Sequence, residues 1–325
     1  MKKTLFSIVV MLATAITAGA VDDNTVEIVY SGTSATVTVA NNISSYVTVS
    51  SGSSSHVKLV QSESFAGVDK TADNEDGEII YVLSGNSDDG EFYMEGSYKA
   101  TVELKGLTLT NPSGPAINIQ DGKRIEVSLK KGTINTLADG ANEDYNGCFH
   151  CKGHTKFKGQ GTLNVAGNSK HAIYSKEYIE LKKSTINITA AQKDAIHCKE
   201  YFLMESGTIN ITGAADDGIQ VELKGDASTG QLADHEDEDS GNFYQEDGLL
   251  TISGYGGKAI KVDGTINYAG GTQNFDTSDT ADATGIDNSQ CTIDNSQCTI
   301  GNSQLLPKGI RIVKSGDTVK KILTK

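Results

Sequence analysis

Apolar and polar residues alternate along the middle of the chain, and the alternation returns at a fixed interval. The segment TINIT at 185–189 returns as TINIT at 208–212, a step of 23 residues, and LNV at 163–165 lies one step before the first. DAI at 194–196 likewise returns as DGI at 217–219. A fixed period in the twenties with alternation inside each unit indicates a solenoid, whose repeats stack on one another.

Each repeat, here called a coil, contains three short alternating segments that predict three β-strands. In one coil these are 179–181, 185–189 and 196–199, separated by turns of Gly, Ser, Lys and Asp. They leave no room for a crossover helix, and the signature of a leucine-rich repeat is absent. We therefore predict an all-β parallel β-helix with three short strands per coil, each strand pairing with its equivalent about 4.8 Å away.

The N-terminal 20 residues have the pattern of a secretory signal peptide. Lys2 and Lys3 precede an apolar run from Leu5, and small residues at 18–20 provide a cleavage site. A transmembrane anchor is the alternative, but the run is short for a bilayer and no stop-transfer pattern follows. No other stretch is apolar enough to span a membrane, so we predict an exported protein without a transmembrane segment.

The period of 23 residues does not hold at either end of the chain. Residues 26–51 alternate without it, which predicts a β cap over the open end of the solenoid. Residues 286–300 instead repeat at a step of seven, as low-complexity linkers do. The predicted organisation is a signal peptide at 1–20, an N-terminal β cap and first coils at 21–98, a parallel β-helix at 99–272 with an acidic insertion at 224–247, a linker at 273–304 and a C-terminal tail at 305–325.

Composition narrows the function. Lys and Arg number 28 against 42 Asp and Glu, a net charge of −14, and the chain has 35 Gly and no Trp. An acidic chain without a basic patch argues against a nucleic-acid partner and is compatible with cation binding. The absence of Trp makes a flat crystalline-cellulose platform less convincing than a groove for a single or acidic glycan chain.

Five cysteines are an odd number for an exported protein. Cys151 and Cys198 fall in one column with Ser175 between them, two coils apart and too distant for a disulfide. We expect small core residues there. A metal or redox pair of Cys148 and Cys151 is the alternative, although no second pair at ligand spacing accompanies it.

The ordered set of segments resembles a known family. IIYVLSG, GLTLTNPSGPAINI, KGTINTLADGAN, GQGTLNVAGNSKHAIYSKE, STINITAAQKDAIHCKE and GTINITGAADDGIQVE follow one another between about Val26 and about Gly271. In this order they are similar to the exported carbohydrate-binding β-helix family with a polysaccharide-lyase-like fold. The resemblance implies a right-handed β-helix, bound calcium, and binding of cellulose or acidic pectic sugars by proteins that look like lyases without being established as lyases.

The tail at 305–325 resembles the C-terminal sorting signal of type IX secretion cargo. A predicted hairpin joins 310–313 to 319–323, after a Leu-x-x-Gly-Ile segment and before a Lys-rich end. The resemblance implies a cell-surface or secreted protein and an outer-membrane export machinery as a partner.

Outward positions in register predict a binding ladder. One column comprises Asn118, His150, Tyr174, His197, Gln220 and Lys261, and the next comprises Lys152, Lys176, Lys199 and Glu222. Side chains repeated in every coil match an extended polymer: Tyr174 to stack on a sugar, the polar groups to bond hydroxyls, and the lysines to meet uronate carboxylates. The alternative is a solvated polar face that protects the sheet.

Carboxylates cluster in the turns just before this column. Asp194, Asp216 and Asp217 lie at one corner of successive coils and are candidate ligands of calcium, a cation that takes several oxygen ligands. Lys193 or Lys170 nearby is the candidate base if the protein eliminates across a calcium-bound uronate. Lysine is also an ordinary turn residue.

The insertion at 224–247 holds one Lys against eight acidic residues. Asp237 and Asp239 within it are further calcium candidates, because such a run is costly to compact without a cation. The spacing does not match an EF-hand, and a solvated acidic loop is the alternative. Together these features predict a secreted or cell-surface polysaccharide-binding protein, assisted by calcium and non-catalytic, with a calcium-dependent pectate-type lyase and a structural stalk or adhesin as the alternatives.

Overall fold

The computed structural model describes residues 21–65, 77–140, 144–224 and 241–276, together with the backbone of three short strands nearer the C-terminus. Regular structure in these ranges is β apart from one 3-10 turn, η1 (Asn41–Ile43). Within the same ranges no helix has the length and apolar character that a membrane span needs. The predicted signal peptide at 1–20 lies outside the described residues. The prediction of an all-β chain built from parallel sheets is confirmed.

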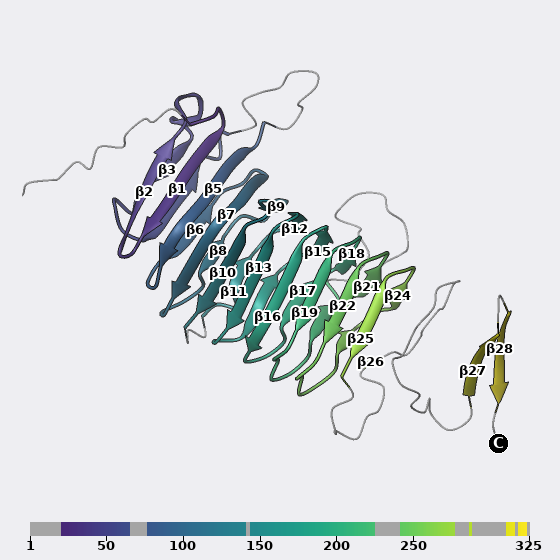
Figure 1. The fold of residues 1–325 in the computed structure, drawn as a ribbon. Helices are drawn as coiled ribbons and strands as arrows, with labels where there is room; N and C mark the ends of the chain where they lie inside the picture. Colours follow the sequence, from purple (N-terminus) through teal and green to yellow (C-terminus); the bar gives the residue numbers. More distant parts are fainter. Residues whose placement is uncertain are drawn as a thin grey trace, which may run out of the picture.

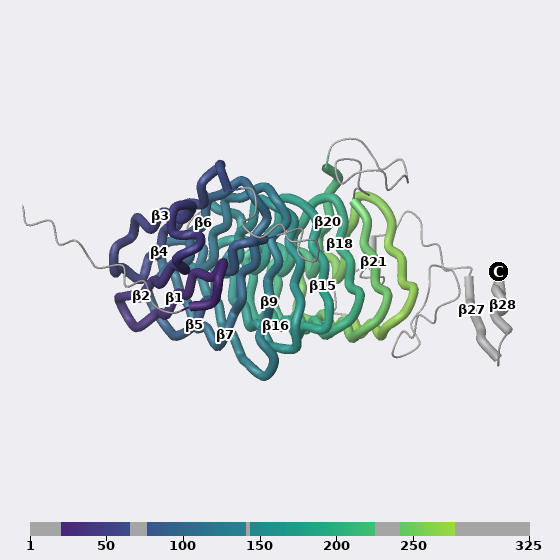
Figure 2. Tube along the Cα trace, turned by 90° about the horizontal axis from the view of Figure 1, so that it is seen from above, coloured from purple at the N-terminus to yellow at the C-terminus, as the bar shows by residue number. Residues whose placement is uncertain are grey.

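Most strands lie in three rows, and strands within a row pair in parallel (Figure 1). The first row comprises β8 (Ile117–Ile119), β11 (Gly147–Cys151), β14 (His171–Ser175), β17 (Ile196–Lys199), β20 (Ile219–Glu222) and β23 (Ile260–Val262). The second comprises β9 (Ile125–Leu129), β12 (Thr155–Gly159), β15 (Ile179–Lys182), β18 (Tyr201–Met204), β21 (Asn242–Gln245) and β24 (Ile266–Tyr268). The third comprises β10 (Ile134–Asp139), β13 (Thr162–Gly167), β16 (Thr185–Ala191), β19 (Thr208–Ile211), β22 (Leu249–Ile252) and β25 (Thr272–Phe275). The rows run side by side along one long axis (Figure 2).

The N-terminal strands close one end of this stack. They are β1 (Thr25–Ser31), β2 (Ser34–Val39), β3 (Val47–Val49), β4 (His56–Gln61), β5 (Ile79–Ser87), β6 (Glu91–Glu95) and β7 (Ala100–Asn111). β1 and β4 pair in parallel with β5 and β6, whereas the outermost strands β2 and β3 pair antiparallel with β1 and β4. The antiparallel strands therefore end the parallel ladder, as expected of a cap.

The long strand β7 serves two rows at once. Its residues 100–104 pair with β9, while 108–111 pair with β10. Between the two halves lies Gly106, at φ 78°, and the neighbouring β5 has Gly85 at φ 84° where the register of the β5–β7 pair shifts. A side chain on Gly85 would lie 2.1 Å from the carbonyl oxygen of Tyr30, so only glycine fits this bend.

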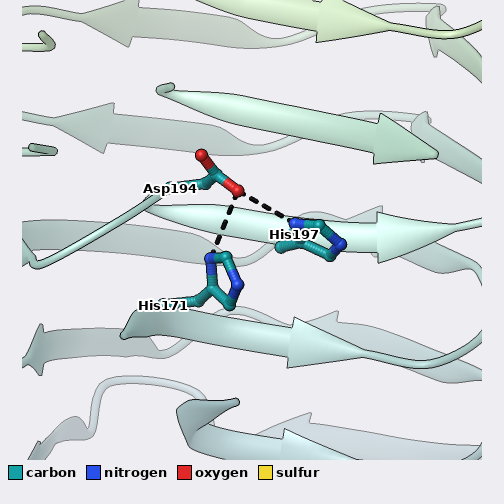
Figure 3. A group of neighbouring side chains, drawn as sticks. All are labelled: His171, Asp194 and His197. Atoms are coloured by element: carbon teal, nitrogen blue, oxygen red, sulfur yellow. Dashed lines mark hydrogen bonds and ion pairs between the residues drawn. The ribbon is translucent and has the colours of Figure 1, made fainter. Parts of the chain in front are cut away.

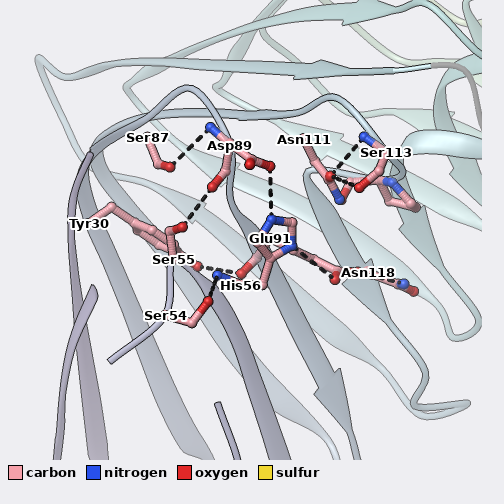
Figure 4. A network of polar contacts seen from close by, with 11 residues as sticks. Tyr30, Ser54, Ser55, His56, Ser87, Asp89, Glu91, Asn111, Ser113 and Asn118 are labelled. Carbon is pink, nitrogen blue, oxygen red and sulfur yellow. Dashed lines mark hydrogen bonds and ion pairs between the residues drawn. The ribbon is translucent and has the colours of Figure 1, made fainter. Parts of the chain in front are cut away.

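A polar network ties the cap to the first coils (Figure 4). His56 Nε2 of β4 lies 2.9 Å from Asp89 Oδ1, and Tyr30 of β1 donates a 3.0 Å hydrogen bond to the Glu91 carbonyl. Asn118 of β8 in turn donates a 2.9 Å hydrogen bond to the Glu91 side chain. Four strands are thereby cross-linked where the antiparallel cap meets the parallel rows.

The core is a stack of inward side chains in register. Leu163 lies beside Ile186, and Ile186 beside Ile209, in consecutive strands of the third row, which confirms the predicted register. All three are at most 2% exposed. Cys151 and Cys198 also flank Ser175 as predicted, and both are fully buried free thiols.

The ladder continues beyond the predicted end of the solenoid at 272. β25 pairs with β22 over 272–275, and β26 (Ile286–Asp287) pairs with β23. Of the inward positions in β25, Gln273 replaces the aliphatic residue of earlier coils and donates a 2.9 Å hydrogen bond to Gln245, so hydrophobic alternation does not reveal the strand. Further along, β27 (Ile310–Ser315) and β28 (Thr318–Leu323) pair as an antiparallel hairpin.

Candidate functional site

The predicted polar column exists in the first row. His150 lies between Asn118 and Tyr174, and Tyr174 is followed in register by His197, Gln220 and Lys261. The column also extends toward the cap, because Tyr93 pairs with Asn118 and Lys58 with Tyr93. One polar side chain per coil thus follows the solenoid axis.

Most of this column is more enclosed than the sequence suggests. His150, Tyr174 and His197 are 7–8% exposed. The Tyr174 ring stacks between His150 and His197, with centroids 5.3 and 5.5 Å away and interplanar angles of 15° and 25°. Both faces of Tyr174 are therefore covered, and only ring edges and polar atoms can meet a ligand. Burial, with the Lys152 charge adding to it, lowers the pKa of His150 to about 4.

Asn118 is withdrawn from solvent altogether. It is 0% exposed, donates to Glu91 and accepts a 2.5 Å hydrogen bond from Gln120. A side chain with both polar atoms bonded inside the fold supports the strand more than it serves a ligand. Gln220 and Lys261, at the other end of the column, are half-buried and accessible.

The neighbouring lysine column is open. Lys152 and Lys176 are exposed, and Lys199 is half-buried. The Lys176 amide donates to the Cys151 carbonyl at 2.9 Å, which places Lys176 one coil beyond Lys152. Lys199 pairs in register with Glu222, and its Nζ lies 3.4 Å from Glu222 Oε2. Three cationic side chains therefore stand in line on one edge of the first row.

Aspartates at the opposite end of the first row, in the turns before its strands, hold one coil to the next. Asp194 Oδ1 accepts a 3.1 Å hydrogen bond from the Asp217 amide, and Asp217 Oδ1 accepts a 2.7 Å bond from the Lys258 amide. Aspartate is favoured at such turns because its short carboxylate reaches a nearby backbone N–H. These bonds link equivalent turn residues of consecutive coils.

The second oxygen of Asp194 faces two imidazoles (Figure 3). Asp194 Oδ2 lies 2.9 Å from His197 Nδ1 and 3.3 Å from His171 Nδ1. Burial alone raises the pKa of Asp194, but the two imidazoles and the Asp217 amide outweigh it and hold the pKa well below its usual range. Burial lowers the pKa of His171, and Asp194 offsets part of that change.

The predicted carboxylate cluster also forms. Donor atoms of Asp194, Asp216 and Asp217 lie within 4.8 Å of one another, with Asp216 exposed and the other two buried. Asp217 Oδ2 is 3.2 Å from Lys261 Nζ. Burial raises the pKa of Asp217, and the Lys258 amide and Lys261 offset part of the rise. The remaining predicted ligands, Asp237 and Asp239, lie outside the described residues.

The two candidate bases stand at the same corner. The Lys193 amide donates a 3.0 Å hydrogen bond to the Lys170 carbonyl, so the two residues occupy equivalent positions in consecutive coils. Lys193 is exposed and directly precedes Asp194, whereas Lys170 is half-buried.

Sequence reasoning missed a second cluster, between the first and second rows. His154 Nε2 lies 3.4 Å from Glu200 Oε2, Lys224 Nζ lies 2.9 Å from Glu200 Oε1, and Lys224 also pairs with Glu177. The His154 ring stacks on the ring of Tyr178, with centroids 4.3 Å apart. His154, Glu177 and Glu200 are spaced by the same 23 residues, so the period itself was the available signal.

Fold and site define a solenoid of parallel sheets whose polar side chains repeat from coil to coil. A family described as "Carbohydrate-binding domain-containing protein" matches residues 68–319, and the chain belongs to this family. Membership and fold together support a carbohydrate-binding role.

Two proteins, one similar in sequence and one in structure, are similar to this chain. A carbohydrate-binding domain-containing protein of Acetivibrio thermocellus is 25% identical over 104 residues, which are 29% of this chain and 36% of that relative. The chain thus matches little more than a third of the relative's length. The solved polysaccharide lyase-like protein from C. thermocellum, studied as a gadolinium derivative, superposes with a TM-score of 0.56 at 20% identity. That match covers 76% of this chain and 99% of the other, and it shows a shared fold.

Proposed function

We propose that the protein is a secreted or cell-surface binder of plant-type or acidic polysaccharide, assisted by calcium and without cleavage of the bound chain. Membership of the carbohydrate-binding family supports a carbohydrate as the ligand. The observation that carries the acidic specificity is the line of Lys152, Lys176 and Lys199 at the ends of the first-row strands, of which Lys152 and Lys176 are exposed. Lysines one coil apart offer ammonium groups at intervals of about 4.8 Å, to which uronate carboxylates on one polymer can bind.

The proposal includes a right-handed coil of three strands. Its support is the pairing of β11 with β8, β12 with β9 and β13 with β10, which returns the chain to each row after three strands. Parallel strands joined by a crossover are right-handed in nearly all proteins. On such a coil the lysine line stays on one face along the axis.

Calcium suits the oxygen donors at the corner. Asp216 is exposed, and Asp217 is a buried carboxylate whose Oδ2 is faced by Lys261 Nζ at 3.2 Å. Calcium takes six to eight oxygen ligands, so Asp194, Asp216 and Asp217 would hold it together with water and sugar carboxylates. In this role the ion would lower the repulsion between the acidic corner and an acidic glycan.

The proposal that the protein is exported is based on sequence patterns at the two ends of the chain. The signal-peptide pattern at 1–20 and the C-terminal hairpin that resembles a type IX sorting signal support secretion and passage through an outer-membrane export machinery. Mass spectrometry of protein recovered from the culture medium tests this, with cleavage after Ala20 and loss of Lys325 as the expected result.

A lyase is the second candidate, because Lys193 adjoins the carboxylate corner in sequence and in space. β-Elimination needs a base within reach of the sugar proton. Incubation of the mature protein with polygalacturonate and calcium separates the readings. Ultraviolet absorbance from unsaturated product identifies a lyase, and retention of the glycan without absorbance identifies a binder.

The decisive experiment measures glycan binding by charge-matched variants. Replacement of Lys152, Lys176 and Lys199 by Ala should weaken binding of polygalacturonate by roughly tenfold or more, with the largest loss at low salt. The control replaces the exposed Lys105, Lys131 and Lys158, which changes net charge equally outside this column. Equal affinity of both triple variants would refute the site, and no retention on any glycan of a panel would leave a stalk or adhesin.

A further inference from the structure

Three donor atoms from two consecutive coils face one point on the first row (Figure 3). His171 begins β14, Asp194 lies in the turn before β17, and His197 is the second residue of β17. Each of these residues is at most 7% exposed, and their donor atoms all lie within 4.8 Å of one another. Two imidazoles and a carboxylate, enclosed and convergent, form the kind of donor set that binds a transition metal.

The spacing of the donors fits ligands of a common ion. Atoms held about 2.1 Å from one ion lie about 3.0 Å apart at an angle of about 90° and about 3.4 Å apart at a tetrahedral angle. The observed separations from Asp194 Oδ2 are 2.9 Å to His197 Nδ1 and 3.3 Å to His171 Nδ1. His171 Nδ1 is buried and, despite this separation, makes no hydrogen bond. Its nitrogen is close to the carboxylate without being directed at it, as expected when both atoms face a third.

Groups behind the donors hold them in place. Asp194 Oδ1 is occupied by the Asp217 amide, which leaves Oδ2 for an ion. The outer nitrogen of His197, Nε2, lies 3.5 Å from Glu222 Oε2. A carboxylate facing the outer nitrogen is the usual companion of a metal-bound histidine, because it fixes the ring orientation.

We propose that His171, Asp194 and His197 bind one divalent transition-metal ion of the zinc type through His171 Nδ1, His197 Nδ1 and Asp194 Oδ2. The two imidazoles distinguish this site from the all-oxygen calcium set with which it shares Asp194, since nitrogen donors favour zinc, nickel, copper and cobalt over calcium. The ion would join two consecutive coils at the start of the first-row strands, whereas the lysine line lies at the ends of those strands. The proposal goes beyond glycan binding and does not depend on it.

Titration with cobalt(II) tests the site directly. Full-length mature protein, made without a histidine tag and stripped with chelator, should develop the visible d–d absorption of nitrogen-ligated cobalt at one equivalent. Zinc should abolish the absorption, and calcium at the same concentration should not. No absorption at one equivalent would overturn the proposal, as would displacement of cobalt by calcium with equal ease.

Variants assign the ligands. His171→Asn should weaken cobalt binding by at least the roughly 10- to 100-fold that even outer-shell partners contribute, and His197→Asn should do the same. His56→Asn, which alters a histidine paired with Asp89 in the cap, should leave binding unchanged. Far-ultraviolet circular dichroism checks that each variant is folded. If His171→Asn is not folded, His171→Gln takes its place. Loss of binding in His154→Asn with retention in His171→Asn would place the ion in the other cluster and refute the assignment.

Discussion

The side-chain amide of Asn187 donates a 2.9 Å hydrogen bond to the side-chain oxygen of Asn164, one coil earlier. Asn210 donates an equivalent 2.9 Å bond to Asn187, so the three amides form a ladder on the outer face of the third row. Asn187→Ala removes both bonds and should lower the free energy of unfolding by about 1–2 kcal/mol. Urea denaturation at neutral pH measures the change.

Asn274→Ala provides the control, because Asn274 lies in the same column at its exposed end. Its substitution should shift stability by less than about 0.5 kcal/mol. Equal effects of the two substitutions would show that the ladder contributes nothing.

The register of the buried side chains in the third row gives a second prediction, on stability. Ile186 is 2% exposed and lies between Leu163 and Ile209 of the neighbouring coils. Ile186→Ala should cost about 3 kcal/mol and Ile186→Val about 1 kcal/mol, because the cavity opens between stacked side chains that cannot collapse along the axis. Thermal and urea unfolding measure both variants. Ile134→Ala, at a position 66% exposed, should change stability by less than about 0.5 kcal/mol.

Burial of His150 predicts a dependence of stability on pH. The pKa of His150 falls to about 4 in the folded protein, so on acidification the unfolded chain binds a proton that the folded chain does not. Stability therefore declines as pH falls below the ordinary histidine value, by about 2–3 kcal/mol near pH 4.5. His150→Gln should lack this part of the decline, as measured by urea denaturation across the pH range.

The same substitution at His56, which is partly exposed in the cap, is the matched control. A pH profile of His150→Gln that runs parallel to that of the wild type would contradict the prediction.

Asp139, the last residue of β10, should act in the opposite direction. Burial raises its pKa to about 6, although the Asn168 amide offsets part of the rise. Its carboxylate is thus protonated more readily in the folded protein. The contribution of Asp139 to the stability of the fold is therefore lost as pH rises through about 6. Asp139→Asn should be more stable than the wild type by about 1–3 kcal/mol at neutral pH, and the gain should vanish near pH 4.

Calorimetric scans at neutral pH and near pH 4 measure the gain in stability of Asp139→Asn. Asp88→Asn, at an exposed position, is expected to show none. A neutral-pH loss of stability in Asp139→Asn would mean that the carboxylate charge is needed by the Asn168 amide.

Periodicity predicted register well because like residues recur at equivalent positions. It predicts that Leu163 lies beside Ile186 and His150 beside Tyr174, and both pairs are found. It could not predict how far neighbours cover one another. The rings of His150 and His197 are wide enough to close over Tyr174, and that depends on rotamers and ring planes rather than on spacing.

The candidate site shows the same division. The period of 23 residues places Asp194 and Asp217 at equivalent corners of consecutive coils, where the Asp217 amide donates to Asp194. The approach of His171 to Asp194 joins residues of consecutive coils that are 23 positions apart but differ in type. A search for similar residues at equivalent positions does not detect this pair. β25 was missed for a related reason, since Gln273 faces inward without being apolar.

The uninterrupted pairing of β16 with β19 has a consequence for how the molecule could change in length. Residues 185–188 meet 208–211 one to one, so inserting or excising 23 residues here would rebuild the same contacts at the new junction. Each inserted copy would extend the molecule by about 4.8 Å and, under the proposed function, would add one more cationic site for the bound glycan. Affinity for long glycans would then grow by avidity, while affinity for short ones would stay unchanged.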